Sequence, residues 1–206
     1  MVVNIPKGTK HQLFYDGNLP DEIIIEEGAS LNVYVLHKGI STKQICKVFL
    51  NGKNSFFELR GLGILNNNQD SSVDLEIEHL VGETESRVLY KNIVNDDAHG
   101  YFRGKIKIAP NAEKSVADLR NHNLLLGDGA SIDTLPELEI YADDVKCSHG
   151  ATSGRLDEEA LFYLRARGIN KSDAKKLLLK AFAEEVFSTC DDLVLKKYLA
   201  DALCNN

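Results

Sequence analysis

A cysteine and a histidine two residues apart, Cys147 and His149, form the most chemically suggestive pair in the chain. They lie in the segment ADDVKCSHGA, residues 142–151. On an extended strand, side chains two positions apart point to the same face, so the thiol and the imidazole would lie together. Both groups ligate iron or zinc once they are deprotonated. Two ligands do not complete a metal site, so the others must come from elsewhere in the fold or from another chain. His122 and Asp118 are the candidates within this chain.

Catalytic alternatives to a metal pair find less support in the residues. A Cys–His pair can act in nucleophilic catalysis, but neither an orienting third group nor an oxyanion hole can be identified here. Asp143 and Asp144 could form an acid pair, but adjacent strand residues point to opposite faces, and a turn suits them better. The chain contains no Walker phosphate loop and no GxGxxG, HExxH or GxSxG motif. We therefore expect a protein that is not an enzyme.

The composition excludes several classes of protein. The chain has 206 residues, 43% of them hydrophobic, which suits one folded domain with or without a short appendage. Its net charge of −7 disfavours nucleic acid as a partner. No run of about 18 apolar residues predicts a membrane span, and the N-terminus lacks the pattern of a secretory signal, so a cytoplasmic location is expected. The cysteines are widely spaced without a CxxC pair, which favours reduced thiols. They are Cys46, Cys147, Cys190 and Cys204.

The elements that must position the Cys–His pair are predicted to be strands. Residues 1–154 show the alternation of apolar and polar side chains that is typical of half-buried strands, as in 73–77, VDLEI. Turn signals at 51–52 and 127–129 are examples of those that separate the strands. Many short strands without helices between them predict a sandwich, a barrel or a β-solenoid, and periodicity leaves the three open.

Residues 155–206 carry a helical pattern instead. They hold nine basic and nine acidic residues, so the net charge of the chain arises upstream of them. Asp157 is the expected N-cap of a first helix that stops near Gly168. Asn170 or Ser172 is expected to cap a second helix.

The second predicted helix has an apolar stripe with i, i+3 and i+4 spacing. Its members are Ala174, Leu177, Leu178, Ala181, Phe182 and Val186. Both internal packing and a partner surface remain open for this stripe, because two or three short helices bury little area among themselves. A third helix is expected to open at Asp191-Asp192 and to run to Leu203.

Residues 121–169 closely resemble the C-terminal core of the SufB/SufD family of iron–sulfur cluster assembly proteins, and the SufD branch in particular. The segment reads NHNLLLGDGASIDTLPELEIYADDVKCSHGATSGRLDEEALFYLRARGI. Upstream, SRVLYKNIV (86–94) and GYFRGKIKIAPNAEKSVA (100–117) are similar to the strand repeats of the family. The likeness extends from about residue 30 to the end of the sequence.

The resemblance implies a mainly β fold, a right-handed parallel β-helix (β-solenoid) over residues 1–154 followed by a small α-helical segment over 155–206. It implies a SufD-like scaffold subunit of the SUF complex that pairs with a SufB-type chain through the β-helices. The C-terminal helices would bind SufC, an ABC-type ATPase, and that ATPase would hydrolyse the ATP. The apolar stripe then becomes a partner surface. Its contact residues would be Leu177, Leu178, Phe182 and Val186.

The resemblance also assigns roles to single residues. His149 matches the histidine of the family's CSHGAT segment, which lies at the SufB–SufD interface and is implicated in cluster assembly, and Cys147 matches the neighbouring cysteine. SufB proteins have a sulfur-accepting cysteine where this chain has Asn121, and a glutamate where it has Gly150. Both departures are SufD-like. They imply that no cofactor is bound stably by this chain alone. A transient iron–sulfur cluster or iron would sit at a shared interface, with His149 and Cys147 as this chain's metal ligands.

Two further expectations concern assembly and length. A β-helix leaves edge strands uncovered at its ends, so the chain is expected to form a homodimer when it is alone. Family members are much longer, with an N-terminal region that this chain is expected to lack or to reduce to residues 1–30.

The main alternative function is a structural or dimerisation β-helix module without a metal role. A carbohydrate-active β-helix enzyme is a further alternative, suggested by the fold alone. Such an enzyme needs clustered carboxylates or basic residues in a groove, and the sequence identifies no such arrangement.

Overall fold

The computed structural model describes residues 1–38, 42–190 and 192. In this part of the chain, twelve strands are followed by two helices. The strands are β1 (Val2–Ile5), β2 (Lys10–Asp16), β3 (Glu22–Ile25), β4 (Ser30–Lys38), β5 (Thr42–Leu50), β6 (Phe56–Leu65), β7 (Asp70–His79), β8 (Glu85–Val94), β9 (His99–Ile108), β10 (Val116–Leu125), β11 (Ser131–Ile140) and β12 (Lys146–Arg155). The helices are α1 (Glu158–Ala166) and α2 (Lys171–Phe187).

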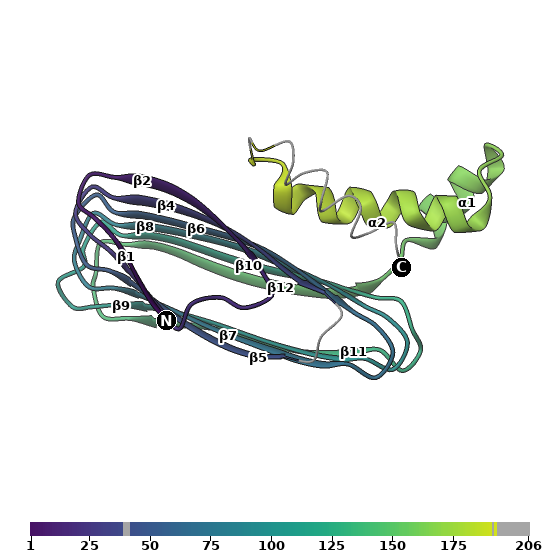
Figure 1. Ribbon diagram of the computed structural model, residues 1–206, viewed down its shortest axis with the longest axis horizontal. Helices are drawn as coiled ribbons and strands as arrows, with labels where there is room; N and C mark the ends of the chain where they lie inside the picture. The colour runs from purple at the N-terminus through teal and green to yellow at the C-terminus, as the bar shows by residue number, and fades with distance from the viewer. Residues whose placement is uncertain (39–41, 191, 193–206) are drawn as a thin grey trace.

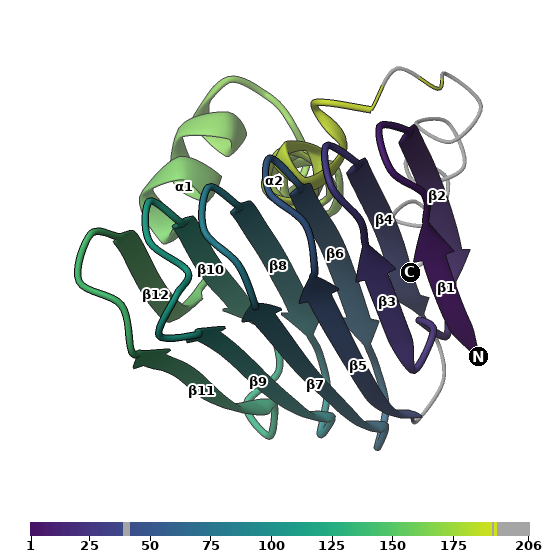
Figure 2. The ribbon, with the colours of Figure 1, turned by 90° about the vertical axis from the view of Figure 1, so that its left-hand side faces the viewer.

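The strands wind into a flattened coil. Each strand pairs in parallel with the strand two positions further along the sequence. The odd-numbered strands therefore form one six-stranded sheet and the even-numbered strands form the other. The chain crosses from one sheet to the other at every turn, which makes a β-solenoid (Figures 1 and 2). The predicted parallel β-helix is confirmed, and the sandwich and barrel alternatives are removed.

Alternate side chains from both sheets fill the space between them. In β7, Val73, Leu75 and Ile77 are buried, whereas Asp74 and Glu76 lie on the outer face, as the period of two predicted. Burying one such aliphatic side chain contributes about 1.5–3 kcal/mol. The stacked coils repeat this burial at every rung, so the interior of the solenoid is the main source of stability.

The predicted turn segments fall between strands and stack on one another. Gly52 lies so close to the preceding coil that an added Cβ would be 2.1 Å from the backbone nitrogen of Glu27. Gly28 has a φ of 66°, which glycine adopts without strain. At equivalent positions of two stacked turns, Asn67 and Asp96 have φ values of 56° and 54°, which asparagine and aspartate tolerate.

Both helices begin where the sequence predicted, and α1 also ends at its predicted stop. The Asp157 carboxylate accepts hydrogen bonds from the backbone nitrogens of Glu159 and Ala160, at 2.9 and 3.0 Å, and so caps α1. Gly168 follows α1 with a φ of 89°. Asn170 caps α2. Ser172, the other candidate for that cap, lies inside the helix.

Helix α2 lies along the outer face of the even-numbered sheet, where it contacts β6 and β8 (Figures 1 and 2). Helix α1 packs against α2. Apart from Asp192, the expected third helix from Asp191-Asp192 to Leu203 lies outside the described residues. Among the helices described here, none is both long and apolar enough to cross a membrane.

Candidate functional site

The Cys–His pair lies on β12, the last strand of the even-numbered sheet. In the parallel register, Cys147 is aligned with Ala117 and His149 with Leu119, both of which are buried. Because the rungs are stacked, Cys147 and His149 continue two inward-facing columns of side chains to the end of the solenoid. The prediction that the two residues share one face of a strand is therefore confirmed.

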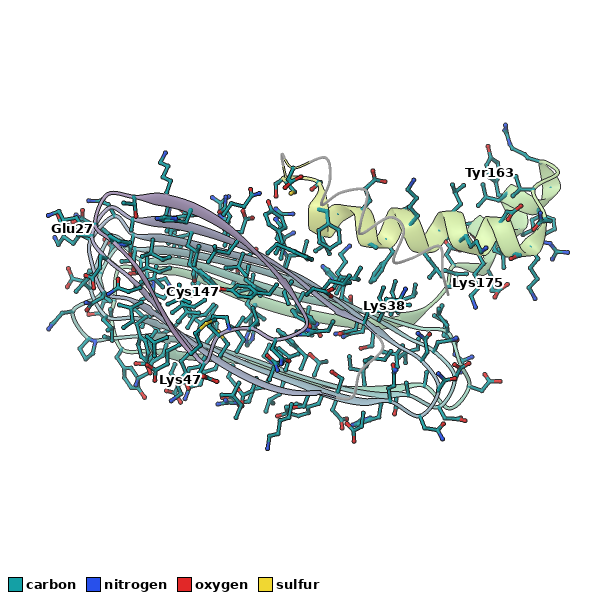
Figure 3. All side chains as sticks on the ribbon, viewed as in Figure 1. Glu27, Lys38, Lys47, Cys147, Tyr163 and Lys175 are labelled. Carbon is teal, nitrogen blue, oxygen red and sulfur yellow. The ribbon has the colours of Figure 1, made fainter. Side chains whose placement is uncertain are left out.

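Cys147 is half-buried and packs against the main core. Figure 3 labels it between the two sheets. Burial raises the pKa of the Cys147 thiol, partly offset by a hydrogen bond from the backbone of Ala117. A protonated thiol is a weak nucleophile, and it must lose its proton before it can bind a metal ion. Cys147 is therefore poorly suited to nucleophilic catalysis in this chain.

His149 is exposed, although it continues an inward-facing column. The column ends with it because β12 has no further strand beyond it among the described residues. His149 is accordingly accessible to a ligand or a partner that approaches the end of the solenoid.

The other two candidate ligands lie on the opposite face of the sheet. The Asp118 carboxylate accepts a hydrogen bond from Ser148 at 2.7 Å and pairs with Arg120 at 3.0 Å. His122 is hydrogen-bonded to Thr152 at 2.8 Å, and burial and the nearby Lys91 lower its pKa. The structure therefore does not bring Asp118 or His122 to the Cys–His pair. Within residues 1–38, 42–190 and 192, no group of three or more His, Cys, Asp or Glu side chains could hold a metal ion.

Asn121 lies one rung inside the end of the solenoid and is fully buried. Its amide nitrogen donates to the carbonyl oxygen of Tyr90 at 3.0 Å. Its amide oxygen accepts from Asn123 at 2.7 Å and from Thr134 at 2.9 Å. Asn121 thus links β8, β10 and β11 through its side-chain hydrogen bonds.

The predicted partner stripe of α2 is divided between two surroundings. Val186 is fully buried, and Phe182 is half-buried beside it in a cluster with Tyr34, Leu62 and Ile93 of the even-numbered sheet. Assigning Val186 and Phe182 to a partner surface needs correction, because this chain's own sheet covers them. The i, i+3, i+4 spacing located an apolar face of α2 without showing which neighbour it contacts.

Helix α2 is also held to the sheet by two cations. The Lys91 ammonium donates to the carbonyl oxygen of Phe182 at 3.0 Å, lies 4.5 Å from the centre of the Phe182 ring and pairs with Glu185. Arg60 donates to the carbonyl oxygen of Glu185 at 2.8 Å. Lys91 is buried, which is unusual for lysine unless it is paired. Nothing in the spacing of the sequence singled out Lys91 or Arg60.

No described residue covers the opposite side of the helical hairpin. Leu177 and Leu178 line a groove of about 910 Å³ between α1 and α2, together with Phe162 and Tyr163. Phe162, Tyr163 and Leu177 are 72%, 55% and 49% exposed, and Figure 3 shows Tyr163 on the side of the hairpin away from the sheets. The predicted partner stripe did not include the two aromatic residues. Their signal is the adjacent Phe-Tyr pair in a short helix with only one buried side chain, Leu161.

Comparison with known proteins gives a consistent match to this arrangement. Residues 20–182 match the family model described as SUF system FeS cluster assembly, SufBD core domain. The chain is 41% identical over 177 residues to the iron–sulfur cluster assembly protein SufD of Escherichia coli K12, which covers 86% of this chain and 42% of that protein.

Two further relatives agree with this match. An iron–sulfur cluster assembly SufBD family protein of Synechocystis is 44% identical over 117 residues, covering 57% of this chain and 25% of that protein. The SufD protein of Plasmodium falciparum is 34% identical over 140 residues, covering 68% and 10%. The chain thus spans less than half of the length of these curated relatives.

Proposed function

Because the chain belongs to the SufBD core domain family of the SUF iron–sulfur cluster assembly system, we propose that it acts as a SufD-like scaffold subunit in the cytoplasm. The observation that carries this proposal is the extent of the match, which runs through the solenoid and into α2. The chain's own part is to present binding surfaces, and the chemistry of the complex is assigned to its partners.

The open end of the solenoid is the surface on which we place a SufB-type partner. Strands β11 and β12 each pair on one side only within the described residues. An exposed edge strand offers unpaired backbone groups to another chain, and a second solenoid would continue both sheets at once. His149 would then lie between the two chains.

The cargo of this interface is a nascent iron–sulfur cluster or iron, held transiently. His149 can offer an imidazole nitrogen to it, and Cys147 lies two residues earlier on the same inward face of β12. Two ligands from this chain require the remaining ligands from the partner. The raised pKa of Cys147 makes His149 the main contribution of this chain at neutral pH.

The groove of the helical hairpin is the surface on which we place the SufC-type ATPase. Its exposed apolar side chains Phe162, Tyr163 and Leu177 offer a contact area that this chain leaves uncovered among its described residues. Leu178 lines the same groove. The acidic residues Asp157, Glu158 and Glu159 border it, so a partner with basic residues around an apolar centre would fit.

Co-purification with the SufB-type and SufC-type proteins of the same organism tests both surfaces. The wild-type chain should co-purify with both the SufB-type and the SufC-type protein. Leu177→Asp should lose the ATPase and retain the SufB-type chain. Ile45→Asp is the matched control, because Ile45 is 52% exposed on the other sheet and should retain both partners. If the wild-type chain binds neither protein, the proposal fails.

The alternative function, a structural module without a metal role, is separated by His149→Ala. In the assembled complex this substitution should strongly lower the amount of cluster that forms, measured by visible absorbance, while the complex stays intact. His11→Ala on β2, an exposed histidine at the other end of the even-numbered sheet, is the control and should have no effect. Unchanged cluster formation in His149→Ala would favour the structural module.

A further inference from the structure

The outer face of the odd-numbered sheet carries charges whose sign changes from strand to strand. The outward positions of β7 hold acidic residues without a basic one, those of β9 hold basic residues without an acidic one, and those of β11 are acidic again. These residues are Asp70, Asp74, Glu76 and Glu78 on β7, Arg103, Lys105 and Lys107 on β9, and Asp133, Glu137 and Glu139 on β11.

The same alternation continues toward the start of the chain. Lys43 and Lys47 occupy outward positions of β5, and Glu22 occupies one on β3. Five consecutive strands of this sheet, from β3 to β11, therefore alternate in sign. The oppositely charged residues are neighbours across adjacent strands of the sheet, and they lie far apart in the sequence.

Ion pairs across the strands give the alternation an energetic meaning. The Arg103 guanidinium pairs with Asp74 at 2.8 Å on one side and with Glu137 at 3.1 Å on the other. Its hydrogen bonds to Glu137 hold the pKa of that carboxyl below its usual range. Lys105 pairs with Glu139 at 2.7 Å. Opposite charges on neighbouring strands stabilise the pairing, and like charges directly opposite each other weaken it.

Strand β11 ends this series with an open edge. Glu76 of β7 has a lysine on each side, with Lys47 at 3.7 Å and Lys105 at 3.9 Å. The carboxylates of β11 have their cations on β9 alone among the described residues. The strand that would continue the alternation is a basic one.

The β11 strand of a second copy of this chain is acidic as well, and not basic as the alternation requires. In an antiparallel pairing of two β11 strands centred on Pro136, Asp133 of one copy lies opposite Glu139 of the other. A pairing centred on Glu137 places that residue opposite itself. Each of these registers brings carboxylates together without a cation between them, so self-pairing works against the pattern of the sheet.

The other edge at this end carries no comparable signal. The outward positions of β12 hold two glycines, a serine, a threonine and a single lysine, Lys146. These mostly small, uncharged side chains allow a partner to approach closely but do not favour a partner of either charge. Discrimination between partners by charge therefore depends on β11.

We propose that the open edge of β11 recognises a strand of a different chain that carries lysine or arginine at alternate positions, in preference to a second copy of this chain. The inference rests on the proposed function in one respect, namely that the other chain is the SufB-type subunit. Two exposed apolar residues of β11, Leu135 and Ile140, at 45% and 43%, favour a partner solenoid over an isolated peptide, because a full rung covers both.

The dependence of association on salt separates the two occupants. Salt screens repulsion as well as attraction. Raising NaCl from 50 to 300 mM should therefore strengthen self-association of this chain and weaken its complex with the SufB-type subunit, each by about tenfold in Kd, the size expected for a few cross-strand charge pairs. Sedimentation velocity of each sample measures both constants. The proposal would be overturned if salt changed both Kd values in the same direction, or if the Kd of the complex did not respond to salt.

Variants that neutralise the carboxylates of β11 provide a second test. Asp133→Asn/Glu137→Gln/Glu139→Gln should raise self-association at 50 mM NaCl and weaken the complex with the SufB-type subunit. Glu78→Gln is the matched control, because it removes one ion pair, with Lys107 at 3.3 Å, from the same face away from the edge. It should alter neither constant. If the triple variant does not fold, Asp133→Asn alone, at an exposed side chain, should shift both constants in the same directions.

The two failures can be told apart. If no SufB-type complex forms at any salt concentration, the proposed function fails. The effect of the triple neutral variant on self-association then still tests whether the carboxylates of β11 oppose self-pairing. If the complex forms but the triple neutral variant leaves the Kd of self-association and the Kd of the complex unchanged, the proposed function stands. The proposed selection of a basic strand by the carboxylates of β11 is then wrong.

Discussion

The Lys91 ammonium of β8 donates a hydrogen bond of 3.0 Å to the carbonyl oxygen of Phe182 on α2. The same ammonium pairs with Glu185 and lies over the Phe182 ring. Lys91→Met should loosen α2 from the sheet and lower the free energy of unfolding by about 1–3 kcal/mol, because it removes hydrogen bonds made by a buried charged group. Urea denaturation measures the loss, and hydrogen exchange should show faster exchange in α2.

Lys107→Met is the control for this substitution. Lys107 pairs with Glu78 at the surface, with 37% of its side chain exposed, and such pairs contribute at most about 1 kcal/mol. Equal losses for the two variants would show that Lys91 does not hold the helix.

Gly61→Ala should destabilise the solenoid by about 1–3 kcal/mol through overpacking. A Cβ at position 61 would lie 2.4 Å from the ring of Tyr90, which is buried and stacked on Phe102 at 4.9 Å. Gly150→Ala meets nothing within 4 Å and should leave the melting temperature nearly unchanged. The comparison is made by thermal denaturation, and a neutral Gly61→Ala would mean that Tyr90 can move.

The strands and the helix caps could be predicted from the sequence because they depend on neighbours a few residues apart. The alternation in residues 73–77 and the side chains of Asp157 and Asn170 are examples. The contacts that decide the site are different in kind. Lys91 meets α2 across 91 positions of sequence, and no spacing rule reports such a contact.

The same limit applies to the predicted ligands. Side chains alternate between the two faces of a strand, so the sequence could place Cys147 and His149 on one face because both belong to one strand. It could not place Asp118, because the face that a residue of another strand presents depends on register. The register aligns Asp118 with Ser148, one position out of phase with the Cys–His pair. The charge alternation of the odd-numbered sheet was likewise hidden, because its partners lie about 30 residues apart.

The free energy of unfolding should fall as the pH is lowered from 6.5 toward 4. Burial lowers the pKa of His37 and of His79 to about 4, whereas an unfolded histidine titrates near 6.5. Between these values the unfolded chain binds more protons, so the stability present above pH 6.5 is lost on acidification. Each histidine contributes up to about 1.4 kcal/mol per pH unit in this window.

His79→Gln should flatten this pH dependence by roughly half, because one of the two buried histidines is removed. Both ring nitrogens of His79 are within 2.8 Å of a hydroxyl group, on Thr84 and Ser86, so the variant should also be less stable at pH 7. Urea denaturation between pH 4 and 7 gives the slopes. The exposed His11 is the control, and His11→Gln should keep the wild-type slope.

Cys147 should react slowly with iodoacetamide at pH 7 and gain reactivity only at pH values above the ordinary pKa of a cysteine. Burial raises the pKa of its thiol, and the thiolate is the reactive form. Cys46, fully buried with a pKa raised to about 12, should not react in the folded chain at either pH. Mass spectrometry of the digested protein assigns the label to each cysteine. Rapid labelling of Cys147 at pH 7 would contradict its protonated state.

Asn121→Cys should not create an accessible thiol, although the resemblance aligns this position with the sulfur-accepting cysteine of SufB proteins. Asn121 is fully buried, and its replacement removes its hydrogen bonds to Tyr90, Asn123 and Thr134, at a cost of about 1–3 kcal/mol. Ala151→Cys is the matched control, because Ala151 is aligned with Asn121 on the next strand and is exposed. Iodoacetamide at pH 9 should label the thiol at position 151 quickly and the thiol at position 121 slowly. Equal labelling would mean that the end of the solenoid opens far enough to admit sulfur chemistry at position 121.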